Sequence, residues 1–132
     1  MYCKAILICE DVRLELNGTM TLVGVHSERL MAPRGKGPMQ VPQLRFVTIV
    51  GGLRGAEALK YRQHLRPAAE RERPDQPFLD EKHDGAADEH NFVFGEGAIA
   101  FPGEGEYEFV TEVEAGGQRK AFRYRFQIVR AT

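Results

Sequence analysis

Tryptophan is absent from this chain of 132 residues, and cysteine occurs only twice. Cys3 and Cys9 lie within one expected strand, where a separation of six residues corresponds to about 20 Å at roughly 3.3 Å per residue. A disulfide needs Cα atoms less than about 7 Å apart, so the two cysteines cannot bridge each other. Neither has the neighbouring Cys or His of a zinc site, so we expect small buried side chains in a reducing compartment.

An excess of charge and a long apolar run are also missing. The chain has 18 basic and 19 acidic side chains and a formal net charge of -1, so no global field attracts nucleic acid or an anionic membrane. The apolar run at residues 5–9 is followed at once by two acidic residues and is too short for a signal peptide or a membrane span. We therefore expect a soluble, cytoplasmic protein that does not bind a membrane.

No segment shows the 3.6-residue apolar period of a helix, whereas alternating segments recur between glycine and proline turns. Hydrophobic residues make up 42% and charged residues 28%, which is ordinary for a globular protein. This pattern predicts one all-β domain over residues 1–132, an antiparallel, immunoglobulin-like β-sandwich of about seven or eight strands. A small barrel is the alternative.

Residues 12–23 alternate around an Asn-Gly pair and predict a β-hairpin. A two-residue loop would pair Leu14 with Thr21 and place the two apolar rows on opposite faces. A three-residue loop that ends at a left-handed Gly18 pairs Leu14 with Met20 and keeps both rows on one face. We expect the second register.

A second hairpin turns at Gly116-Gly117, and its strands alternate aromatic and charged side chains. We expect one face to be core and the other to be a solvated ladder of charges. The expected pairs are Tyr107–Phe126, Phe109–Tyr124 and Thr111–Phe122 on the core face, and Glu108–Arg125, Glu114–Arg119 and the diagonal Glu112–Arg123 on the charged face.

The middle of the chain contains further strands. Residues 43–50 are apolar on both faces, which predicts a strand covered on both sides or used in an oligomer contact, so a homodimer is a hypothesis. Residues 59–66 alternate except at Gln63, where a bulge would explain the polar residue. Residues 91–94 and 98–101 are expected to be short strands separated by glycines.

Two irregular stretches interrupt the strands. Residues 66–90 contain three prolines and a dense mixture of charges, and long connections of this kind are usually functional or disordered. Residues 31–42 carry Arg34 and Lys36 on a loop rich in glycine and proline. We expect these two loops to be the contact surfaces for a protein partner.

The long connection also contains donors that suit a metal ion, namely His83, Asp84, Asp88, Glu89 and His90. The H-E-x-x-H spacing is absent, and the Gly85-Ala86-Ala87 segment between the histidines fixes no geometry. A solvated acidic loop is the simpler interpretation, and a metal-dependent protein that uses the loop from His83 to His90 is the alternative.

No catalytic motif emerges, so neither an enzyme nor a cofactor is expected. Glu10 and Asp11 are neighbours in a strand and point to opposite faces, so we expect a structural role for one of them, near Arg13 or Arg29. Ser27 is the sole serine and lies outside any nucleophile motif.

Basic and aromatic side chains suggest two further kinds of site. Acidic residues interleave with the basic positions and no exposed aromatic platform is evident, so a nucleic-acid partner is not expected. A small-molecule or sugar binder would need aromatics that line a groove. The basic positions are Lys60, Arg62, His64, Arg66, Arg71 and Arg73, and the aromatic candidates are Tyr61, Phe78 and Phe92.

Two sequence motifs resemble motifs of known protein families. The sequence CEDVRLELNGTMTLVGV at residues 9–25, together with FPGEGEYEF at residues 101–109, resembles a family of small bacterial β-sandwich proteins defined only as a domain of unknown function. The turn before Tyr107 also resembles the entry to a late strand of immunoglobulin-like domains, although their paired cysteines and tryptophan are missing. The resemblance implies a fold but no activity.

The sequence therefore predicts a non-catalytic, intracellular β-sandwich that binds another protein or itself. A small-molecule or sugar binder, and a metal-dependent protein, are the alternatives.

Overall fold

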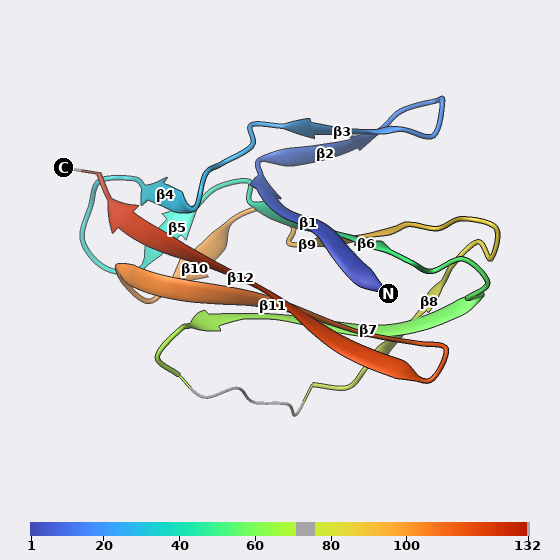
Figure 1. Ribbon diagram of the computed structural model, residues 1–132. Helices are drawn as coiled ribbons and strands as arrows, with labels where there is room; N and C mark the ends of the chain where they lie inside the picture. Colours follow the sequence, from blue (N-terminus) through green and yellow to red (C-terminus); the bar gives the residue numbers. More distant parts are fainter. Residues whose placement is uncertain (71–75, 132) are drawn as a thin grey trace.

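The computed structural model describes residues 1–70 and 76–131 (Figure 1). These residues form β-strands and no helix, so the all-β prediction is confirmed. The described residues form twelve strands where seven or eight were expected, because several short strands were not foreseen. In chain order they are β1 (Tyr2–Cys9), β2 (Asp11–Leu14), β3 (Met20–Val23), β4 (Arg29–Ala32), β5 (Met39–Val41), β6 (Arg45–Gly51), β7 (Ala58–Pro67), β8 (Leu79–Lys82), β9 (His90–Phe94), β10 (Ile99–Phe101), β11 (Gly105–Ala115) and β12 (Gln118–Arg130).

The strands form four open sheets. The larger two have the orders β1-β6-β9 and β4-β12-β11-β7-β8, and they lie in two layers (Figure 1). The ribbons β5–β10 and β2–β3 complete the set. The described strand pairs are antiparallel except β4 with β12, which is parallel, so the expectation of a purely antiparallel fold is wrong at this edge.

The hairpin of β11 and β12 has the expected register, with Tyr107 opposite Phe126 and Glu108 opposite Arg125. Gly116 and Gly117 have φ angles of 56° and 79°, the left-handed conformation that a two-residue hairpin turn requires. The alternating sequence therefore determines both the pairing and the face on which each side chain lies.

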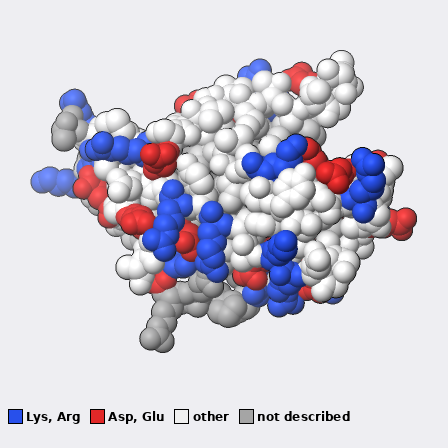
Figure 2. Space-filling view, in the orientation of Figure 1, with Lys and Arg blue, Asp and Glu red and all other residues white. Residues whose placement is uncertain are grey.

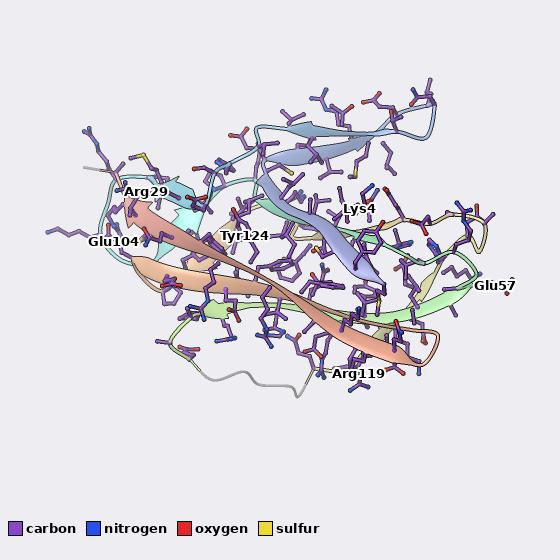
Figure 3. The ribbon with its side chains drawn as sticks, viewed as in Figure 1. Lys4, Arg29, Glu57, Glu104, Arg119 and Tyr124 are labelled. Carbon is purple, nitrogen blue, oxygen red and sulfur yellow. The ribbon has the colours of Figure 1, made fainter. Side chains whose placement is uncertain are left out.

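The core lies where β6 crosses β11. The rings of Phe46 and Phe109 stack with centroids 4.5 Å apart, and Phe126 lies 5.5 Å from Phe46. A second apolar cluster around Leu59 and Phe92 fills the other end of the space between the sheets. Tyr124 points from β12 toward the first cluster and is partly buried there (Figure 3).

A polar contact lies at the centre of the β6–β11 crossing. The hydroxyl groups of Thr48 and Thr111 are 2.9 Å apart and both residues are fully buried. Gln63 on β7 donates an amide N–H to the Thr111 hydroxyl at 3.1 Å. The expected bulge at Gln63 is wrong, because β7 pairs with β11 in continuous register and the core offers this amide a partner.

Tyr107 stabilises the loop that precedes β11 through two hydrogen bonds to Gly103. Its hydroxyl donates to the carbonyl oxygen of Gly103 at 2.7 Å and accepts from the Gly103 N–H at 3.2 Å. A tyrosine that bonds to backbone a few residues upstream is the tyrosine corner of many β-sandwiches. The ring is buried against Phe101, with centroids 5.0 Å apart.

The β2–β3 hairpin also has the expected register, with Leu14 opposite Met20 and Gly18 left-handed at φ 83°. Glu15 and Thr19 close a three-residue loop through a backbone hydrogen bond of 2.8 Å. The ribbon projects beyond the two layers at the top of Figure 1, and its apolar row is not sealed from solvent.

The two irregular stretches are shorter than expected. Residues 31–42 contain the end of β4 and all of β5, and residues 66–90 contain the end of β7, all of β8 and the start of β9. β8 was missed because its polar sequence, LDEK, lacks alternation, and it is a strand because it pairs with β7 at the sheet edge.

The Thr48–Thr111–Gln63 cluster yields a matched pair of substitutions. We expect Thr111→Val to lower the free energy of unfolding by about 2 to 3 kcal/mol, because it removes the partner of the buried Thr48 hydroxyl and of the partly buried Gln63 amide. Thr48→Val should cost about 1 kcal/mol, because Thr111 keeps the bond from Gln63. Urea denaturation of both variants measures the difference, and equal losses would contradict the assigned network.

Candidate functional site

A groove separates the projecting β2–β3 hairpin from the sheet below it. Its volume is about 790 Å³, and its apolar lining comes from Val12, Leu14 and Met20 on the hairpin and from Val93 on β9. Leu14 is 84% exposed and Val93 is 45% exposed. In Figure 2 the projecting region at the top is largely free of charged side chains. The exposed leucine and valine make this groove a candidate contact site.

β6 is the central strand of the sheet beneath the groove, and this position explains why its sequence is apolar on both faces. Phe46 and Val50 face the core, while Val47 lies on the opposite face beside Val93 and is fully buried. Ile49, on the same face as Val47, remains partly exposed. The expected strand at residues 43–50 is thus confirmed as a central strand, and its outer face is covered only in part.

The rim of the groove carries charges of both signs. Asp11 and Glu96 are acidic, and Arg45 is basic. Asp11 accepts a hydrogen bond from the Val12 N–H at 2.9 Å and lies 3.7 Å from the Arg13 guanidinium. A surface with an apolar centre and a mixed rim has the composition of a protein interface.

The outer face of the five-stranded sheet is built differently. Its central strand β11 presents a row of glutamates, and its neighbours β7 and β12 present rows of basic residues. Figure 2 shows blue and red side chains interleaved over this part of the surface. The facing positions are Glu108, Glu112 and Glu114 on β11, with Lys60, Arg62 and Arg66 on β7 and Arg119, Arg123 and Arg125 on β12.

Glu108 is the centre of this face and is only 3% exposed. One of its carboxylate oxygens accepts from Arg66 at 2.6 Å and from Arg123 at 2.9 Å. The other accepts from Arg125 at 3.1 Å. Burial alone would raise the pKa of Glu108, but the hydrogen bonds from Arg123 and Arg125 and the charge of Arg66 outweigh it and lower the pKa.

The expectation of a solvated charge ladder is therefore wrong at Glu108. β11 is the central strand of this sheet, so long arginine side chains from both neighbours close over it. Farther along, Arg62 pairs with Glu112 at 2.9 Å and stacks over the Phe78 ring at 4.3 Å. Glu112 bonds to Arg62, which lies directly opposite it on β7, whereas Arg123 bonds to Glu108.

None of the aromatic candidates for a sugar site lines one of the grooves described for residues 1–70 and 76–131. Phe92 is buried in the core, Tyr61 packs on it at 5.0 Å, and Phe78 lies between Arg62 and Arg119. The basic positions on β7 share one face as expected, and Arg71 and Arg73 lie outside the described residues.

His83 and His90 are brought together by the turn between β8 and β9. Their Nδ1 atoms are 3.1 Å apart, and His83 is only 8% exposed. The interpretation of this segment as a solvated loop is therefore wrong for His83, because the turn folds back on the segment before β7. Asp84 and Asp88 cap backbone N–H groups, and no group of three or more His, Cys, Asp or Glu side chains suited to a metal occurs in residues 1–70 and 76–131.

Asp11 lies near Arg13, as one of the two expectations had it. Glu10 is exposed at the bend between β1 and β2, and Arg29 lies on β4, in a different sheet from Asp11. Cys3 and Cys9 are free thiols, and burial raises the pKa of both. Within the described part of the chain, no helix is long and apolar enough to cross a membrane.

Comparison of the sequence with models of known protein families gives no match, and comparison with curated proteins gives none either. The resemblance of residues 9–25 and 101–109 to a bacterial family of unknown function therefore stays a prediction. Function is therefore inferred from the surfaces described above.

Because of Glu108, we expect the free energy of unfolding to depend on pH. Its pKa is lower in the folded chain than in the unfolded chain, so its contribution to stability is complete above the unfolded value of about 4.3 and is lost as the pH falls through the folded value. We expect Glu108→Gln to reduce the free energy of unfolding by about 3 kcal/mol at pH 7, and by less at pH 3.

Glu106→Gln is the matched control, because Glu106 is on the same strand and face but its side chain is 47% exposed. It should change stability little at either pH. Urea denaturation at the two pH values makes the comparison. A loss at Glu108 that does not change with pH would show that its ionised form is not the stabilising one.

Proposed function

We propose that this protein is a non-catalytic, intracellular, immunoglobulin-like β-sandwich that associates with a second copy of itself through the groove under the β2–β3 hairpin. The observation that carries the proposal is the exposure of Leu14 and Val93 on facing walls of that groove. Burying an exposed leucine or valine side chain contributes roughly 1.5 to 3 kcal/mol, so closing the groove favours association. The tyrosine corner at Tyr107 supports the immunoglobulin-like part of the proposal.

The hairpin itself gives a reason for a partner. Among the described residues, β2 and β3 pair as strands only with each other. An isolated two-stranded ribbon is marginally stable in water and needs an apolar face that packs against something. Leu14 lies on that face and remains exposed in the single chain.

Charge argues for a second copy as the partner. The groove rim holds Asp11 and Glu96 together with Arg45, so two copies related by a twofold axis can place opposite charges against each other. The formal net charge of -1 opposes association only weakly. By contrast, the arginines around Glu108 are engaged with it, which leaves that face less suited to an anionic partner.

Leu14→Glu tests the proposal. We expect the unaltered chain to be a dimer and the variant a monomer at micromolar concentration, because a charge would be buried at the centre of the interface. Light scattering coupled to size exclusion measures the mass. Leu14 is 84% exposed in the single chain, so the variant should fold normally by circular dichroism.

Met31→Glu is the control, since Met31 on β4 is 66% exposed and lies outside the groove lining. It should leave the dimer intact. A monomeric unaltered chain at 100 µM would reject self-association, and binding of a different protein that is lost in Leu14→Glu would redirect the proposal to that partner.

A further inference from the structure

The turn between β8 and β9 holds two imidazole rings in a chelating arrangement. The Nδ1 atom of His83 faces the Nδ1 atom of His90 at 3.1 Å, and the ring planes are inclined by 68°. His83 is buried, and the His90 side chain is 17% exposed. The two Nδ1 atoms therefore face each other at hydrogen-bond distance.

The far side of each ring is held by an oxygen acceptor. His83 Nε2 lies 2.9 Å from the carbonyl oxygen of Ala87, which can only accept, so His83 carries its proton on Nε2. This leaves the lone pair of His83 Nδ1 directed at His90. On the other ring, His90 Nε2 lies 3.5 Å from a carboxylate oxygen of Glu81. Backbone carbonyls and carboxylates in these positions are the usual outer partners of metal-binding histidines.

The geometry points to a site for a borderline divalent transition-metal ion, such as Zn²⁺ or Ni²⁺, held between the Nδ1 atoms of His83 and His90. Zn–N bonds are about 2.0 to 2.1 Å long, and a tetrahedral angle between two of them needs nitrogens about 3.3 Å apart. The observed 3.1 Å requires an opening of only a few tenths of an ångström. Imidazole nitrogen suits zinc, nickel and copper, and it does not suit calcium or magnesium.

The number of protons on the two histidines does not change when a metal ion binds. Without a metal, His90 donates its Nδ1–H to His83, because His83 Nδ1 has no proton to give. When a metal binds, that proton leaves His90 Nδ1 and a proton is carried on Nε2, where Glu81 accepts it.

The backbone around the pair is fixed by the preceding turn. The Gly55 N–H donates to Gly85 O at 2.7 Å, and the Leu53 N–H donates to Asp88 O at 2.9 Å. Glu57, which comes just before the start of β7 (Figure 3), lies beside Gly85 and accepts a hydrogen bond from the His83 N–H through its carbonyl oxygen. The protein supplies two ligands and water completes the coordination, so we expect weaker binding than at a site with three or four protein ligands.

Metal titration of the full chain tests the site. After treatment with EDTA and its removal, Zn²⁺ or Ni²⁺ at 100 µM should raise the melting temperature by roughly 3 to 6 °C, and Mg²⁺ and Ca²⁺ should not. Isothermal titration should give one ion per chain. Co²⁺ should produce visible absorption bands of a nitrogen-ligated ion.

His90→Gln should abolish these responses, and His26→Gln, which alters a half-buried histidine elsewhere, should leave them unchanged. His90 is at the edge of the structure and its side chain is not fully buried, so the variant is expected to fold, and circular dichroism checks this. No binding of Zn²⁺ or Ni²⁺, or the same binding in His90→Gln, would overturn the proposal. Neither result bears on the dimer, because the groove residues take no part in this site.

Discussion

The crossing of β6 over β11 is the contact on which the rest of the structure depends. Each strand is central in its sheet, so the position of one relative to the other sets the position of both layers. Stacking of Phe46 on Phe109 supplies the apolar contact, and the hydrogen bond between Thr48 and Thr111 fixes the alignment along the strands. A buried polar pair tolerates little sliding, because a shifted register would leave both hydroxyl groups without partners.

The opposite side of β11 is organised by charge. A pleated strand that sends aromatics into the core must send its alternate residues outward, and here these include Glu106, Glu108, Glu112 and Glu114. Basic rows on both neighbours neutralise them, and guanidinium groups close over Glu108. The same strand therefore joins the two layers through its inner face and ties three strands together through its outer face.

The candidate sites lie away from this centre. The groove is formed where the β2–β3 hairpin leaves the end of β1, and the histidine pair is formed where β8 and β9 leave the opposite sheets. Loops and ribbons at the periphery are free to carry function because the packed strands already supply stability. The two sites share no lining residue, so association and metal binding are separate properties.

Local alternation in the sequence determined the strands of both hairpins, their registers and the turns at Gly18 and Gly116-Gly117, because these depend on neighbours along the chain. It also showed that β6 lacks a polar face. Only the tertiary structure decided the parallel edge of β4, the burial of Glu108 and the meeting of His83 with His90. Those features depend on which strands become neighbours, and a sequence pattern does not specify contacts between segments that are distant or folded back on one another.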